Sequence, residues 1–165
     1  MEPIKIGLLG LGTVGSGTFD VLTRNQNEIL RRAGRGIEIA AIGVRDAARA
    51  RKRVGGAIPI TTQLTDVVRH PDIDIVVELI GGEEPARSLV MEAIALGKHV
   101  VTANKALLAR HGNEIFKAAQ DRGVMVAFEG AVAGGIPIIK ALREGLSANR
   151  IEWLAGIING TSNFI

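Results

Sequence analysis

Short apolar runs alternate along the chain with longer stretches in which apolar residues recur at helical spacing. The short runs have the length of buried strands, and they predict strands at 4–9, 37–44, 73–80, 98–102, 124–128 and 151–158. The longer stretches predict helices at 13–32, 47–54, 85–96, 107–122 and 136–146, with a further helix that begins at 65–70. Because strands alternate with helices, we predict βαβ units and therefore an α/β fold, a doubly wound parallel sheet with helices on both faces.

Composition and charge restrict the possible classes of protein. The 165 residues make about one domain, and 47% are hydrophobic although only 3% are aromatic, so we expect an aliphatic core. The formal net charge of +3 is spread along the chain, which disfavours a nucleic-acid surface. There is no Cys to form disulfides or a thiolate metal site. No run has the length of a signal peptide or a membrane span, so we expect a cytoplasmic protein without a membrane partner.

We expect the main domain to span 1–150 and the residues 151–165 to be the first strand of a second domain. The residues that follow the last predicted strand, 159–165, form no polar tail. We interpret this ending as a point inside a longer protein, in which most of the second domain is absent from this chain.

A glycine-rich motif follows the first predicted strand and opens the first predicted helix. Residues 10–15 read Gly-Leu-Gly-Thr-Val-Gly and match G-x-G-x-x-G, which gains meaning from this strand–helix context. Gly10 allows the tight turn, Gly12 lets the backbone approach a pyrophosphate, and Gly15 lets helix and strand pack closely. The helix N-terminus then offers N–H groups to the phosphates. The motif predicts a Rossmann-type dinucleotide site, with a purely structural turn as the alternative.

The end of the second predicted strand bears on the choice of dinucleotide. NAD sites commonly place an acid there to bind the ribose 2′-hydroxyl, whereas this chain has Arg45 first and Asp46 next. The Arg45 guanidinium is suited to a 2′-phosphate, and the basic residues at 49–53 add to the positive field. We therefore favour NADP, with NAD possible. The alternative is a solvated basic helix that Asp46 caps.

Three further predicted strands end in residues that suit a binding site, at 78–82, 102–105 and 129–137. Ligands of open α/β sheets bind outside the carboxyl ends of the strands. Lys105 is a cation at this edge, next to an amide side chain, and could hold a carbonyl oxygen or assist proton transfer during hydride transfer. The alternative role for Lys105 is that of a surface residue or helix cap.

Five segments together resemble the homoserine dehydrogenase family. They are, in order, GLGTVGSG, VVELIGG, GKHVVTANKALLA, FEGAVAGGIPII and GIINGTSNFI, and the resemblance runs from Ile4 to Ile165. It implies an oxidoreductase that interconverts L-homoserine and L-aspartate 4-semialdehyde with NAD(P). That reaction belongs to the aspartate pathway of threonine, methionine and isoleucine biosynthesis.

The resemblance also implies roles for individual residues. Leu11, Thr13 and Val14 would lie along the cofactor with the three glycines, and Arg45 would meet the adenosine ribose or its phosphate. Lys105 matches the family's lysine next to cofactor and substrate. Gly160 and Thr161 would lie beside the substrate. The family's monovalent cation, usually sodium, would be bound largely by backbone carbonyls of a loop that supplies Glu129, Val132, Gly134 and Ile136. The alternative for this segment is a glycine-rich strand–helix turn in which Glu129 points elsewhere.

One departure from the family concerns the substrate domain, whose acidic residues and second lysine would follow residue 165. We therefore expect the fragment alone to be inactive and the full protein to be a homo-oligomer. A different class of function stays open, namely a stand-alone dinucleotide-binding or redox-sensing module. Another Rossmann enzyme, such as an aspartate-semialdehyde dehydrogenase, is disfavoured because that chemistry usually calls for a nucleophilic Cys and this chain has none.

Overall fold

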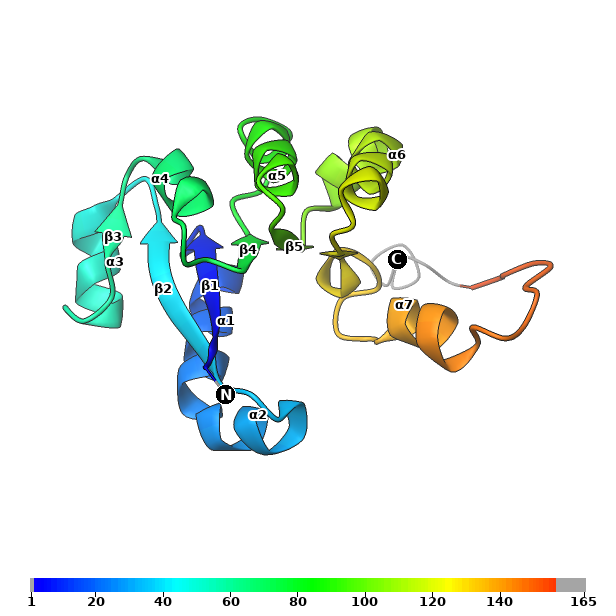
Figure 1. Ribbon diagram of the computed structural model, residues 1–165, viewed down its shortest axis with the longest axis horizontal. Helices are drawn as coiled ribbons and strands as arrows, with labels where there is room; N and C mark the ends of the chain where they lie inside the picture. The colour runs from blue at the N-terminus through cyan, green and yellow to red at the C-terminus, as the bar shows by residue number, and fades with distance from the viewer. Residues whose placement is uncertain (1, 157–165) are drawn as a thin grey trace, which may run out of the picture.

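The strands form one six-stranded parallel sheet in the computed structural model, which describes residues 2–156 (Figure 1). Its order is β3-β2-β1-β4-β5-β6, and every neighbouring pair is parallel. The strands are β1 Ile4–Leu9, β2 Ile37–Gly43, β3 Ile60–Thr61, β4 Ile75–Glu78, β5 His99–Thr102 and β6 Val126–Ala127. The order reverses between β1 and β4, which creates a switch point where ligands of such sheets bind.

Helices connect the strands and cover both faces of the sheet. They are α1 Thr13–Arg24, α2 Gln26–Ala33, α3 Ala47–Val54, α4 Leu64–Arg69, α5 Ala86–Ala95, α6 Lys105–Arg122 and α7 Ile138–Lys140. A 3-10 turn, η1 Glu129–Ala131, precedes α7, and a π turn, η2 Ala141–Gly145, continues it. In Figure 1, α4, α5 and α6 lie in a row above the sheet. The predicted doubly wound α/β fold is thus confirmed.

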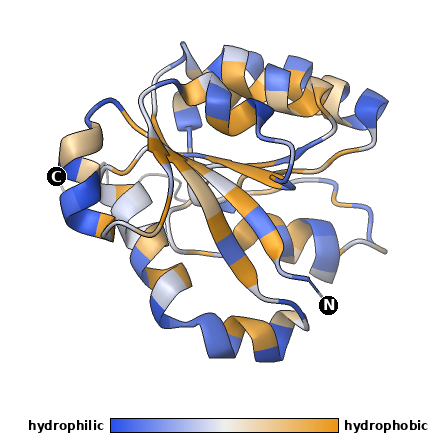
Figure 2. Cartoon of the chain, turned by 60° about the vertical axis from the view of Figure 1, so that its left-hand side comes forward, coloured by the Kyte–Doolittle hydropathy of each residue, from blue (hydrophilic) through white to orange (hydrophobic). Residues whose placement is uncertain are grey.

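Two aliphatic cores lie on the two faces, as the alternation along β1 requires. Ile6 and Leu8 face the core that contains Phe19 of α1 and Ala50 of α3. Leu9 faces the larger core under α4, α5 and α6. The hydrophobic residues of these helices gather on the sides that face the sheet (Figure 2). None of the helices between residues 2 and 156 is long and apolar enough to cross a membrane.

Several predicted elements differ from those observed. The helix predicted at 13–32 is two helices, because Asn25 leaves the helical conformation between α1 and α2. The two-residue strand β3 is too short to be recognised from apolar periodicity, and the strand predicted at 124–128 is reduced to β6. The helix predicted at 136–146 begins only after Pro137, which occupies its N-cap.

The strand predicted at 151–158 is not observed in its described part. Residues 151–156 adopt no regular secondary structure, and residues 157–158 lie outside the described chain. A strand is defined by hydrogen bonds to a neighbour, and the six described strands form a sheet that does not include this segment. The proposed division of the chain at residue 150 stays a prediction.

Candidate functional site

The glycine loop between β1 and α1 has the close contacts that the motif predicts. Gly10 has φ +95°, and a Cβ there would lie 2.8 Å from the carbonyl oxygen of Leu79. A Cβ on Gly15 would lie 2.1 Å from the carbonyl oxygen of Gly10. Neither position accepts a side chain. By contrast, a Cβ on Gly12 would meet no atom within 4 Å, so the loop leaves open space at its middle glycine.

The N-terminus of α1 opens onto this space. Its N-cap is Gly12, which has no side chain to accept a hydrogen bond, and the first turn contains no acidic residue. The first N–H groups of a helix lack partners within the helix and carry the positive end of its dipole. Thr13 and Val14 are exposed here, Val14 by 57%, so both side chains border the open space. These features fit a phosphate group that approaches Gly12.

The end of β2 brings Arg45 and Asp46 to the same edge of the sheet. The Asp46 carboxylate accepts a hydrogen bond of 2.9 Å from the N–H of Arg49 and caps α3, so that one of its oxygens is already engaged. Arg53 pairs with Asp20. Arg45 is exposed and takes part in none of the ion pairs found between residues 2 and 156. The arrangement supports both the capping role of Asp46 and the availability of Arg45 for a ligand.

The ends of β4 and β5 carry polar side chains that are buried. Glu78 is 0% exposed, and Thr102 and Asn104 are buried as well. Glu78 Oε1 accepts from the N–H groups of Ile80 and Gly81, at 2.9 and 3.1 Å, and Oε2 accepts from the Thr102 hydroxyl at 2.6 Å. The sequence predicted these strand ends but not the burial of Glu78. The available signal was an acid inside the apolar run 73–80.

Lys105 is the first residue of α6 and is exposed. Asn104 caps this helix, because its Oδ1 accepts from the N–H of Leu107 at 3.1 Å. A cation in the first turn of a helix interacts unfavourably with the helix dipole, so helix stability does not explain why Lys stands here. Asn104 is the cap, so the helix-cap alternative for Lys105 is wrong, whereas the surface-residue alternative and the functional role both stay open.

The loop that follows β6 is folded around the Glu129 carboxylate. Its two oxygens accept from the N–H groups of Ile139 and Lys140, at 2.9 and 2.8 Å, so that the side chain stabilises the start of α7. The carbonyl oxygen of Glu129 accepts from Val132, and that of Ile136 accepts from Ile138. Ala133 and Gly134 have positive φ, which turns the chain sharply.

The cation predicted in this loop stays a prediction. Residues 2–156 contain no cluster of three or more His, Asp or Glu side chains that could hold a metal ion. A site of backbone carbonyls at Glu129, Val132, Gly134 and Ile136 needs no such cluster. The predicted substrate residues Gly160 and Thr161 lie outside the described part of the chain.

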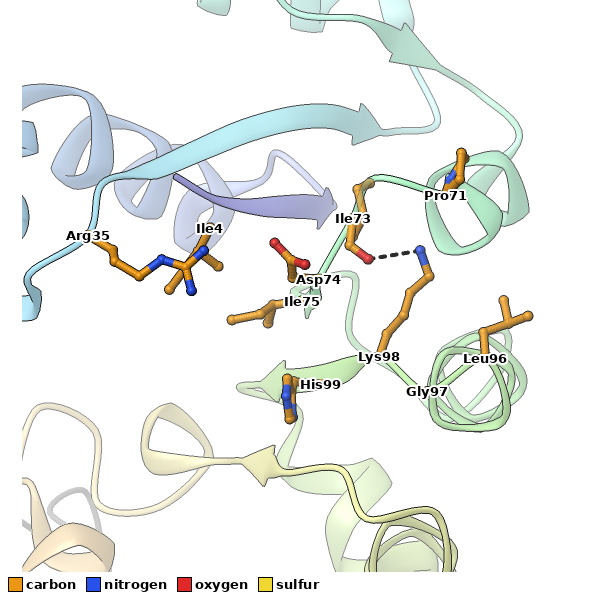
Figure 3. Close-up of a pocket in the computed structure, with 10 residues that line it drawn as sticks. All are labelled: Ile4, Arg35, Pro71, Ile73, Asp74, Ile75, Leu96, Gly97, Lys98 and His99. Atoms are coloured by element: carbon orange, nitrogen blue, oxygen red, sulfur yellow. Dashed lines mark hydrogen bonds between the residues drawn. The ribbon is translucent and has the colours of Figure 1, made fainter. Parts of the chain in front are cut away.

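A hollow of about 460 Å³ lies at the opposite, amino edge of the sheet (Figure 3). Its lining includes Ile4, Arg35, Asp74, Lys98 and His99. The Lys98 ammonium donates hydrogen bonds to the carbonyl oxygens of His70 and Ile73, and burial lowers the pKa of Lys98. This cation is thus engaged by the protein itself. Because the hollow is at the wrong end of the strands for the glycine loop, we do not assign it to the dinucleotide site.

The fold and the carboxyl-edge geometry fit a Rossmann-type dinucleotide-binding domain, and comparison with known proteins agrees. Residues 10–129 match the family model described as "Homoserine dehydrogenase, NAD binding domain", and residues 137–165 match the model "Homoserine dehydrogenase". The chain therefore belongs to the homoserine dehydrogenase family.

Individual relatives are similar over the whole chain. It is 66% identical to homoserine dehydrogenase of Pseudomonas aeruginosa and 56% identical to that of Neisseria gonorrhoeae, covering all of this chain and 38% of each relative. The crystal structure of a homoserine dehydrogenase from Thiobacillus denitrificans has a TM-score of 0.91 and 70% identity, covering 99% of this chain and 38% of that one. The chain thus spans well under half the length of these relatives.

Proposed function

We propose that this chain is the cofactor-binding part of an enzyme that interconverts L-homoserine and L-aspartate 4-semialdehyde, with NADP(H) preferred over NAD(H). The proposal rests on two features that lie at the carboxyl edge of the sheet in this member of the homoserine dehydrogenase family. One feature is the open glycine loop, and the other is Lys105 at the start of α6.

The glycine loop fits a dinucleotide because it leaves room where the pyrophosphate would approach. Gly12 has no atom within 4 Å of a would-be Cβ, and the uncapped N-terminus of α1 supplies N–H donors beside it. Gly10, Leu11, Gly12, Thr13, Val14 and Gly15 would bind the phosphates and the adjoining sugars. Exposed Arg45 would bind the 2′-phosphate, which is the basis for the NADP preference.

A bound nicotinamide supplies the hydride that adds to the aldehyde carbon of the semialdehyde, and accepts it in reverse. During reduction, negative charge develops on the carbonyl oxygen, which then takes up a proton to give the hydroxyl of homoserine. A preorganised cation beside that oxygen lowers the barrier. We assign this role to Lys105, whose exposed ammonium belongs to the rim of the site.

The proposal also includes a bound cation, a metabolic role and an oligomeric state. Carbonyl oxygens suit a hard monovalent cation such as Na⁺, and the sharp turn at Ala133 and Gly134 supports a cation in the 129–136 loop. The reaction would serve threonine, methionine and isoleucine biosynthesis in the cytoplasm. The complete protein would be a homo-oligomer whose substrate domain lies outside this chain.

The direct test is turnover by the complete protein that carries these residues. Purified protein should oxidise NADPH in the presence of L-aspartate 4-semialdehyde and reduce NADP⁺ in the presence of L-homoserine. Protein that binds NADPH tightly but turns over neither substrate would contradict the proposal and favour a dinucleotide-binding module.

A further inference from the structure

Three polar side chains are buried together at the ends of β4 and β5, where the surrounding core is largely aliphatic. Glu78, Thr102 and Asn104 are 0%, 1% and 6% exposed. Burial of a carboxylate costs free energy unless hydrogen bonds replace the lost water. Across residues 2–156 no buried side-chain nitrogen or oxygen lacks a hydrogen-bond partner, so this group is fully satisfied.

The hydrogen bonds of these residues form a closed circuit between two loops. Glu78 accepts from the backbone N–H groups of Ile80 and Gly81 and from the Thr102 hydroxyl. The Thr102 oxygen in turn accepts from the N–H of Asn104, at 3.0 Å. The Asn104 side chain then donates to the carbonyl of Gly82, at 2.6 Å, which returns to the loop that Glu78 holds. We call these three residues the Glu78 circuit.

The Glu78 circuit connects the two halves of the proposed site. Leu79, the residue after Glu78, places its carbonyl oxygen 2.8 Å from where a Gly10 Cβ would stand, so the β4 loop packs on the glycine loop. On the other side, Asn104 caps α6 and is followed directly by Lys105. The Glu78 circuit therefore connects the β4 loop, which packs on the glycine loop, to the start of α6, where Lys105 stands.

We propose that the Glu78 circuit positions Lys105 and the Gly81–Gly82 backbone around the reacting carbon of the nicotinamide, with Glu78, Thr102 and Asn104 acting as positioning residues. This inference rests on the proposed function, because it assigns a role in the same reaction. A displacement of about 1 Å in a reacting geometry lowers the rate by about 100-fold, so a mere loosening of these loops is sufficient for a large effect.

The donors around Glu78 explain why a carboxylate stands there. Two N–H groups and one O–H group all donate toward it, and a carboxylate can only accept. In Glu78→Gln, the amide nitrogen would face either the backbone N–H groups or the Thr102 hydroxyl. If the amide nitrogen faced Thr102, it would donate to the hydroxyl oxygen, which reverses that bond and leaves the hydroxyl hydrogen without its acceptor. If it faced the loop, it would set a donor against the N–H groups of Ile80 and Gly81.

The experiment uses the complete protein and compares Thr102→Val, Thr102→Ser and Glu78→Gln. Val has the shape of Thr without its hydroxyl, and Ser keeps the hydroxyl. We expect Thr102→Val to lower kcat by about 100-fold while the Kd for NADPH changes less than threefold. Thr102→Ser should restore kcat to within about fivefold of the wild type, and Glu78→Gln should lower it at least tenfold.

Val100→Ala is the matched control for a loss of stability. Val100 is buried in β5, two residues before Thr102, and has no polar atom in the circuit. The Val100→Ala substitution should lower Tm and leave kcat per folded molecule unchanged. If Thr102→Val and Glu78→Gln fold and retain wild-type kcat, or if Val100→Ala loses kcat as strongly as Thr102→Val, the positioning role is overturned. Wild-type protein without turnover would instead overturn the proposed function, and the positioning role with it.

Discussion

Three alanine substitutions in one short segment separate the structural and binding roles of the glycine loop. In Gly15→Ala the new Cβ would lie 2.1 Å from the Gly10 carbonyl oxygen, so the contact must open by about 0.9 Å to reach even the 3.0 Å limit of real structures. The oxygen belongs to the backbone and the position of a Cβ is fixed by the backbone, so neither atom can rotate away. Overpacking of this kind costs about 1–3 kcal/mol of folding free energy.

The same displacement would move the N–H groups of α1 away from the place where we expect the phosphates. A hydrogen bond to a charged group contributes about 1.5–3 kcal/mol, so the loss of one weakens binding by about 10- to 100-fold. Gly12→Ala adds a methyl group to open space, at a cost to the helix N-cap below about 1 kcal/mol. Because that space is where we expect the pyrophosphate, it should weaken NADPH binding nearly as strongly as Gly15→Ala.

Gly17→Ala is the control, since Gly17 lies inside α1 with nothing within 4 Å of its would-be Cβ. It should stabilise the fold by about 0.5–1 kcal/mol and leave affinity unchanged. Urea unfolding and calorimetric titration with NADPH measure both quantities for all three variants. Wild-type stability and affinity in Gly15→Ala, or unchanged affinity in Gly12→Ala, would refute this reasoning.

Other residues give predictions that are independent of the glycine loop. Arg45→Ala should weaken binding of NADPH about tenfold more than that of NADH, measured against Arg24→Ala, an exposed cation in the last turn of α1, as a basic control; equal losses would remove Arg45 from 2′-phosphate recognition. Lys105→Met in the complete protein should lower kcat about 100-fold or more without lowering Tm, and normal turnover would exclude its catalytic role. Lys98→Met tests the amino-edge cation, whose pKa burial lowers. Because the unfolded chain then binds more protons at alkaline pH, the wild type should gain stability over Lys98→Met as the pH rises from the folded pKa toward the unfolded one. A difference in unfolding free energy that does not vary with pH would contradict this.

Sequence patterns predicted the parts of this molecule that depend on local chemistry. The apolar runs predicted β1, β2, β4 and β5. The glycine spacing predicted the turn after β1, where close contacts with Leu79 and within the loop leave no room for a side chain at Gly10 or Gly15. The sequence pattern also predicted that Lys105 lies at the carboxyl edge of the sheet, because the carboxyl ends of parallel strands share one edge. Family resemblance supplied the residue roles that no periodicity contains.

The features that were missed either leave no mark in the apolar periodicity or depend on contacts between distant segments. The break at Asn25 and the shortening of β6 have no counterpart in periodicity. The Glu78 circuit joins residues that are 24 positions apart, and only the folded chain shows that the acid is satisfied by Thr102. Asp46 caps α3, which was one of the roles considered for it, but the sequence alone could not distinguish capping from binding of the ribose.

The central claim is that a nicotinamide dinucleotide binds at the carboxyl edge of the sheet, and a crystal structure of the protein with NADPH tests it most directly. We predict that the pyrophosphate lies over Gly12 at the N-terminus of α1, the 2′-phosphate lies beside Arg45, and the nicotinamide lies between Gly81–Gly82 and Lys105. A dinucleotide found in the amino-edge hollow beside Lys98 and His99, or away from the glycine loop, would contradict the account.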